Sequence, residues 1–244
     1  MDSGFYSAFT GLAARMQSLD LLANNLANVN TAGYKSQKEF FRAFTASLRN
    51  QGLTQVNQAI NDYGLVGGAR VDLTAGALQS TGNDTDLALD GSGFFVVKTK
   101  AGLRYTRNGN FQLNPARQLV DADGDLLQGQ NGPIQVPSGK LNISSDGTIS
   151  VDGAIVDQLK LVDFAPATQL SPEGNMDFAV PQGTETIAVT GQVRQGMLEA
   201  SNSDPVTGAV ALMSLQRNAE MMQRALSIFN TDFNQTAVQE LPRV

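Results

Sequence analysis

The chain has 244 residues, a formal net charge of −6, and neither cysteine nor histidine. These absences exclude disulfides, cysteine-based zinc sites and catalysis by a thiolate or a histidine, so a non-enzymatic protein is favoured. No run of Lys and Arg exceeds two residues, which disfavours nucleic-acid binding because that needs a positive surface.

Signals for membrane insertion and secretion are also missing from the sequence. No apolar stretch approaches the roughly 20 residues that a membrane-spanning helix needs, so no membrane insertion is expected. The start of the chain (Met1, Asp2, Ser3) lacks the basic flank and apolar core of a secretory signal, so we expect no cleaved signal peptide.

A heptad pattern predicts a helix over residues 5–29. The apolar positions are separated by alternating steps of four and three residues, as in the seam of a coiled coil. They are Phe5, Phe9, Leu12, Met16, Leu19, Leu22 or Ala23, and Leu26. Gly33 ends the stretch Asn30–Gly33 and is expected to cap this helix in the left-handed conformation.

The middle of the chain has the character of a β domain. Residues 36–70 precede it as a linker or extended segment, although residues 38–48 have a pattern that would also continue as helix. Turn dipeptides, as at Asp123-Gly124 and Asp152-Gly153, separate short strand candidates at intervals close to ten residues. The strand candidates are Leu87–Leu89, Gly93–Val97, Ile134–Val136, Leu141–Ile143, Thr148–Val151 and Leu159–Val162.

A second heptad pattern predicts a C-terminal helix. Its apolar positions are Leu212, Leu215, Ala219, Met222, Leu226, Phe229 and Phe233. Pro205 suits the first turn, with Asn202, Ser203 or Asp204 as the cap.

Each apolar seam needs a partner, and two arrangements are open. The helices could pack on their own β domain, or they could pair with each other and then with neighbouring copies. The second arrangement is favoured because residues 1–33 carry only three charges (Asp2, Arg15 and Asp20), whereas a solvated helix face normally carries many.

The acidic motifs of the middle region do not form a recognisable catalytic or metal site. Asp121-Ala-Asp123-Gly-Asp125 resembles the start of a calcium loop, but Leu126 and Gly132 stand where the EF-hand needs Gly and Glu, so a hairpin turn is favoured. Gly91-Ser-Gly93 precedes a strand, which indicates a turn and not a dinucleotide loop. We therefore predict no catalytic residue, metal site, cofactor or small-molecule substrate.

Several stretches, in order and at matching spacing, resemble the flagellar rod and hook family. They are Ala23–Lys35, Gly76–Thr81 with Asp86–Val97, Tyr105–Phe111 with Leu119–Gly129, and Gly196–Asn202 with Leu215–Arg217 and Glu220. The motif residues carried over from the family are Asn24, Asn25, Leu26, Ala27, Asn28, Thr31, Gly33, Asp90, Gly91, Gly93, Phe94 and Phe95.

The resemblance implies a structural subunit of the flagellar basal body, exported by the flagellar type III apparatus without a cleaved signal. Such subunits assemble with copies of themselves and with neighbouring rod and hook proteins into a hollow helical tube that crosses the periplasm and transmits torque from motor to hook. The assembly interface is then expected on the two seams, at Phe5, Phe9, Leu12, Met16, Leu19, Leu26, Leu212, Leu215, Met222, Leu226, Phe229 and Phe233.

Within the family, the proximal-rod type is favoured and the distal-rod or hook type is the alternative. Asn218-Ala219 after Gln216-Arg217 and the tail Glu240–Val244 depart from the distal-rod pattern, and 244 residues scarcely hold the extra outer domain of a hook protein. A remoter alternative is an adhesin or carbohydrate-binding β domain on a coiled-coil stalk, but the lack of Trp leaves little for sugar stacking.

The sequence thus predicts an α+β fold, in which the terminal helices form a coiled-coil arm and the centre forms a mainly antiparallel β domain. The expected division is an N-terminal helix (1–35), a linker (36–70), a β domain (71–201) and a C-terminal helix (202–244).

Overall fold

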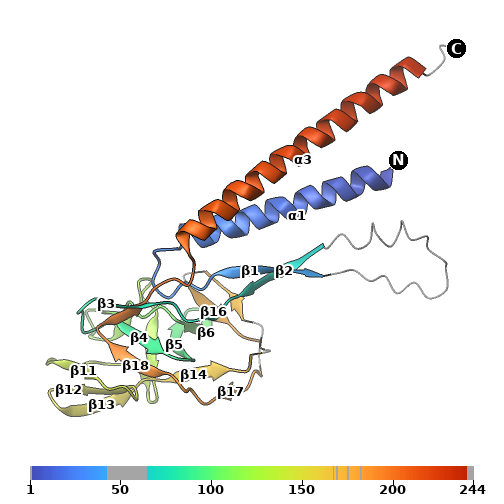
Figure 1. Ribbon diagram of the computed structural model, residues 1–244. Coiled ribbons are helices and arrows are strands. Elements are labelled where there is room, and N and C mark those ends of the chain that lie inside the picture. The colour runs from blue at the N-terminus through green and yellow to red at the C-terminus, as the bar shows by residue number, and fades with distance from the viewer. Residues whose placement is uncertain are drawn as a thin grey trace. The chain divides into compact units, whose positions relative to one another are not determined.

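The structure is a computed structural model that describes residues 2–42, 65–166, 168, 170–174, 176–181 and 183–240. Within them the fold is α+β, as expected: helix α1 spans Asp2–Ala27, helix α3 spans Pro205–Glu240, and the intervening chain forms strands (Figure 1). No helix in these residues is long and apolar enough to cross a membrane.

The chain divides into two compact units. The helical unit contains residues 1–27, 37–70 and 204–244, and the β unit contains residues 28–36 and 71–203. The segment that follows α1 in the sequence therefore folds as part of the β unit.

The strands are short and numerous. Their bounds are β1 Gln37–Arg42, β2 Leu65–Val71, β3 Leu78–Ser80, β4 Leu87–Asp90, β5 Phe94–Thr99, β6 Gly102–Thr106, β7 Gln112–Leu113, β8 Leu119–Val120, β9 Leu126–Gly129, β10 Gly132–Pro133, β11 Leu141–Ile143, β12 Thr148–Val151, β13 Ala154–Gln158, β14 Leu161–Phe164, β15 Ser171–Pro172, β16 Asp177–Ala179, β17 Thr186–Ile187, β18 Gln192–Gln195 and β19 Met197–Glu199.

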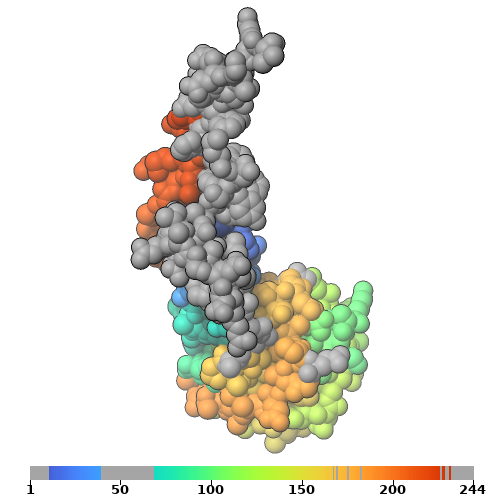
Figure 2. Space-filling view, turned by 90° about the vertical axis from the view of Figure 1, so that its right-hand side faces the viewer, coloured from blue at the N-terminus to red at the C-terminus, as the bar shows by residue number. Residues whose placement is uncertain are grey.

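Antiparallel pairing builds every sheet of the β unit. The largest sheet has the order β15-β16-β6-β5-β9-β8-β7 with β10, β14 and β17 attached, while β11, β12 and β13 form a three-stranded sheet. Strand β18 pairs with β4, and β19 pairs with β3, so the last strands of the unit lie beside its first ones. In the space-filling view, cyan, green, yellow and orange segments accordingly share one surface (Figure 2).

Strand β5 separates two hydrophobic cores because successive side chains of a strand point to opposite faces. Phe95 and Val97 belong to the larger core, where the rings of Phe95 and Phe111 meet edge to face at 5.5 Å. Phe94 and Val96 belong to the smaller core, which contains three further aromatic side chains, Phe164, Phe178 and Tyr105.

The structure corrects several of the predicted elements. Residues 37–42 form strand β1, whereas the pattern of residues 38–48 allowed a helix; residues 43–48 lie outside the described part. The Asn25 side chain explains the extended start, since its Nδ2 donates to the Gln37 carbonyl and its Oδ1 accepts from the Gln37 N–H. Ile134–Val136 contributes one isolated bridge, Gln118 to Gln135, instead of a strand.

The start of α3 agrees with the sequence analysis. Pro205 is the first helical residue, and the cap is Asp204, whose Oδ1 accepts from the Val206 N–H at 3.1 Å. The Thr207 hydroxyl also donates to Asp204, and these bonds to the charged form hold the pKa of the Asp204 carboxyl below its usual value.

Gly33 has the expected left-handed conformation but does not cap α1. Its φ is +70°, yet α1 ends at Ala27, because Asn28 and Thr31 form a separate turn in which the Thr31 N–H donates to the Asn28 carbonyl. A Cβ on Gly33 would lie 2.3 Å from the backbone nitrogen of Asn108. The position therefore requires glycine for two reasons, its φ and the close approach of another backbone.

We expect Gly33→Ala to destabilise the β unit far more than Gly82→Ala. Gly82 has nearly the same φ, +71°, but nothing lies within 4 Å of its Cβ position, so its substitution should cost only the left-handed penalty of about 1–2 kcal/mol. Urea denaturation followed by circular dichroism measures both variants. Equal losses of stability would show that the backbone at Asn108 can move away from the added methyl group without a loss in the free energy of unfolding.

Candidate functional site

Three charged side chains meet in the interior of the β unit: Lys35, Arg107 and Glu199. Lys35 Nζ lies 2.6 Å from Glu199 Oε1, and both side chains are fully buried. Arg107 Nη1 lies 3.2 Å from Glu199 Oε2, and the Arg107 side chain is only 5% exposed. One carboxylate thus serves two cations, and we call these three residues the ion group.

Backbone groups complete the coordination of Lys35 and Glu199. Lys35 Nζ donates to the Thr74 carbonyl at 2.7 Å, and Glu199 Oε1 also accepts from the Gly76 N–H at 2.8 Å. Burial lowers the pKa of Lys35, while the hydrogen bond and the charge of Glu199 act in the opposite direction. The ammonium group depends on Glu199 to remain charged in this environment.

Arg107 connects the ion group to strands β4 and β5. Its Nη2 donates to the Gly91 carbonyl at 2.8 Å, and its guanidinium lies 5.4 Å from the centre of the Phe94 ring. Nε of Arg107 is buried without a hydrogen-bond partner. The family-motif residues Gly91 and Phe94 are therefore direct neighbours of the ion group.

A second set of hydrogen bonds joins the same chain segments beside the ion group. The Asn202 side chain accepts from the Ser36 N–H at 2.8 Å and donates to the Asp72 carbonyl at 2.8 Å. The Asp72 N–H donates to the Ser36 carbonyl, and the Gly33 N–H donates to the Glu199 carbonyl at 2.7 Å. The segment after α1 and the segment before α3 are thus held together within the β unit.

The sequence analysis did not single out the three charged residues, although a signal was present. Each of the three is the sole charged residue of its motif stretch. Lys35 lies in residues 23–35, Arg107 in residues 105–111, and Glu199 in residues 196–202. Two cations and one anion, each alone in an uncharged stretch, are the composition that a buried ion group requires. Only the tertiary structure brings them together.

The other family-motif residues serve turns and packing. Phe94 and Phe95 fill the two cores, Gly91 and Gly93 form the turn between β4 and β5 with φ of 115° and 127°, and exposed Asp90 pairs with Arg194 at 3.1 Å. Asn25, Asn28 and Thr31 hold the chain after α1 as described above, and Asn24 and Ala27 lie on an exposed face of α1.

The two helices pack lengthwise on each other. The Met222 Cε lies 3.5 Å from the Cβ position of Gly11, and Leu26 Cδ1 lies 3.8 Å from that of Gly208, so the helices are antiparallel. Of the predicted seam residues, Leu12, Leu19, Leu26, Leu212, Leu215 and Met222 are half-buried and Ala219 is buried, but Met16 is 53% exposed. The side chains of Phe5, Phe9, Leu226, Phe229 and Phe233 lie outside the described part.

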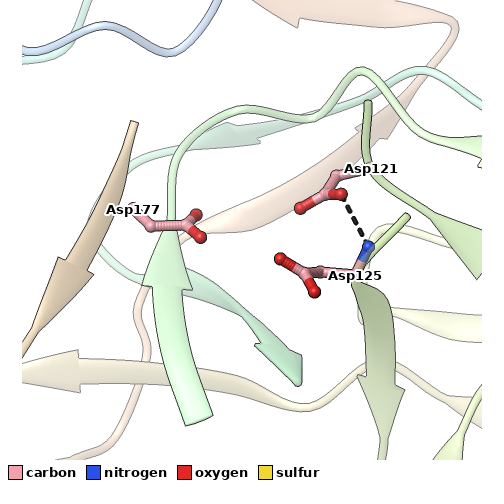
Figure 3. Close-up of side chains that lie close together, drawn as sticks. All are labelled: Asp121, Asp125 and Asp177. Carbon is pink, nitrogen blue, oxygen red and sulfur yellow. Dashed lines mark hydrogen bonds between the residues drawn. The ribbon is translucent and has the colours of Figure 1, made fainter. Parts of the chain in front are cut away.

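Three carboxylates form a separate cluster in the β unit (Figure 3). Asp121 and Asp125 belong to the β8–β9 hairpin turn, as expected, and the Asp125 N–H donates to Asp121 Oδ1 at 2.9 Å. Asp177, at the start of β16, points toward both, and one oxygen of each of the three lies within 4.8 Å of the others. Carboxylates this close together repel one another when all are ionised, and a bound proton or cation relieves that repulsion.

The cluster shifts the titration of its members. Burial, and to a lesser extent the charges of Asp121 and Asp125, together raise the pKa of Asp177 to about 7. Burial also raises the pKa of Asp121, although backbone N–H donors from Asp125 and Asp123 oppose this. Asp177 is thus the carboxyl that holds a proton near neutral pH.

Comparisons with known proteins place the whole chain among flagellar proteins. Family models match residues 5–35 (flagella basal body rod protein), 88–151 (flagellar hook protein FlgE/F/G D1 domain) and 194–237 (flagellar basal body rod FlgEFG protein, C-terminal). The ion group takes one residue from each of these three matched regions.

Curated relatives match over nearly their full lengths. The flagellar basal-body rod protein FlgF of Caulobacter vibrioides is 31% identical, with 100% of each chain covered. FlgG of Bacillus subtilis is 30% identical over 91% of this chain and 93% of its own, and FlgF of Salmonella typhimurium is 30% identical over 99% and 98%.

Glu199→Gln should destabilise the β unit by about 3–5 kcal/mol, because it leaves two buried cations without a counter-charge. The matched control is Asp90→Asn, which breaks an ion pair whose side chains are 45% and 51% exposed and should cost less than about 1 kcal/mol. Urea denaturation midpoints give both values. Similar losses for the two variants would contradict the role of the ion group.

The stability of the β unit should fall as pH rises toward 7. The pKa of Asp177 is about 7 in the folded protein against about 3.9 in an unfolded chain, so the folded state binds the extra proton between these values. Asp177→Asn mimics the protonated form and should raise stability at pH 8 by on the order of 1 kcal/mol, with little effect near pH 4. Denaturation at both pH values, with a chelator present, measures this. A stability difference independent of pH would refute the assignment.

Proposed function

This chain belongs to the flagellar basal-body rod protein family and is a structural subunit of the bacterial flagellar basal body; we propose that it occupies the proximal rod, as the FlgF type does. A FlgF relative aligned from end to end supports this choice, as do Asn218-Ala219 and the tail after Glu240. FlgG relatives have a similar sequence identity to this chain, so the distal rod is the alternative position.

The packing of α1 on α3 is the observation that supports assembly through the chain ends. Leu212, Leu215, Ala219 and Met222, at steps of three, four and three residues, turn toward α1, which is the spacing of a coiled-coil seam. We propose that this pair is a coiled-coil arm that enters the core of the rod, while the β unit forms its outer layer. Contacts that do not close on themselves then generate a helical tube.

A structural role also accounts for the chemistry of the β unit. The buried charges of the ion group are neutralised by ion pairs and bound to backbone groups, and we propose that the chain performs no catalysis. The proposed partners are copies of the chain and neighbouring rod and hook proteins. We further propose export through the flagellar type III apparatus without a cleaved signal.

An epitope placed at Asp123-Gly124, an exposed hairpin tip, tests both the function and the position. A strain without the gene should fail to swim, and the tagged chain should restore swimming. Antibody label on isolated basal bodies should lie at the motor-side end of the rod. Label at the hook-side end would reject the proximal assignment in favour of the distal one, and swimming without the gene would reject the rod function.

A further inference from the structure

Helix α3 carries a second apolar row, on the face opposite to α1. Five large side chains on it are more than half exposed: Val206 at 71%, Val210 at 64%, Met213 at 58%, Met221 at 60% and Ile228 at 60%. At 100° per residue they fall on one stripe, about half a turn around the helix from Leu215 and Ala219. A stripe of this size on a helix surface marks a place where another surface binds.

Charge indicates which surface this is. Arg217 lies in the middle of the stripe, between Met213 and Met221, and Glu220 and Arg224 lie on the same face, so two basic residues and one acidic residue give the stripe a net positive charge. The exposed face of α1 presents Ala13, Met16, Asp20, Ala23 and Ala27, at steps of three and four residues, so an acidic side chain stands among small and apolar ones. In the part of the chain that the structure describes, the ion pairs join other residues and include neither Arg217 nor Asp20.

The two faces do not meet within one chain, because the α3 stripe lies on the side of α3 turned away from α1. We propose that the α3 stripe of one copy binds the exposed α1 face of a second copy, with Arg217 paired to Asp20. The inference rests on the proposed function, in which copies of the chain assemble side by side, and it names the surface that joins them.

The register of this contact follows from the helix pair. Within one copy, Gly11 is level with Met222 and Leu26 is level with Gly208, which places Asp20 level with Met213. Arg217 lies one helical turn beyond, so the second copy must be displaced by about 5.4 Å along the arm. A repeated displacement of this kind yields a helical polymer and not a closed ring.

The same displacement brings a large side chain over a small one at two positions. With Asp20 opposite Arg217, Ala27 faces Val210 and Ala23 faces Met213, whereas Met16 faces Met221. Alternation of large and small residues lets two helices approach closely, as knobs enter holes in a coiled coil. These two contacts and the Asp20–Arg217 pair are the features of the proposed register that the experiments test.

Cysteine cross-linking tests the contact, since the chain itself contains no cysteine. A chain with Ala23→Cys and Met213→Cys, expressed in the deletion strain and oxidised in isolated basal bodies, should yield disulfide-linked multimers. The control pair, Ala23→Cys with Val206→Cys, is displaced by two turns, beyond the roughly 7 Å between Cα atoms that a disulfide allows, and should stay monomeric. Multimers from the control pair alone, or none from either pair in swimming cells, would overturn the proposal.

Charge reversal gives an independent measurement. Asp20→Arg and Arg217→Glu should each reduce swimming at least about tenfold, and the double variant should restore it, whereas Gln216→Glu, beside the stripe, should leave it unchanged. Failure of the double variant to rescue would overturn the pairing while the rod function stands. If the wild-type chain itself restored no swimming, the proposed function would fail instead.

Discussion

The two buried ion pairs of the Glu199 carboxylate are the interaction on which the β unit depends. The carboxylate neutralises Lys35 and Arg107 in an interior where an unpaired charge is costly, and it also accepts a backbone N–H. The three side chains come from segments far apart in the sequence, so each one fixes the position of the other two. Such a group adds little net stability over an apolar core, but it permits one arrangement only.

Two residues of the ion group, Lys35 and Glu199, lie close in sequence to points where the chain passes between the two units. The chain passes between the two units at residues 27/28, 36/37, 70/71 and 203/204. Ser36, Asp72 and Asn202 lie within two residues of three of these passages and are hydrogen-bonded to one another beside the ion group. These bonds fix the ends of the segments within the β unit itself.

The helices carry two apolar rows of different character. The strict row of α3 packs on α1 of the same chain, and the exposed row carries side chains of similar size but with an arginine among them. The exposure of the second row and its position on the face of α3 opposite to α1 are visible only in the folded structure.

The sequence by itself determined the α+β class, the two terminal helices, most strands of the middle region and the family, because periodicity, turn dipeptides and motif spacing are local properties of the chain. Tertiary structure decided the rest. Residues 37–42 became a strand because they pair with β2, and the Asn25 side chain binds the backbone of Gln37 at the start of that strand. Gly33 allows the close approach of the backbone at Asn108 and does not cap a helix. Single charges in three distant stretches became one ion group, and Asp177 joined the hairpin carboxylates, because contacts between remote segments form only when the whole sheet folds.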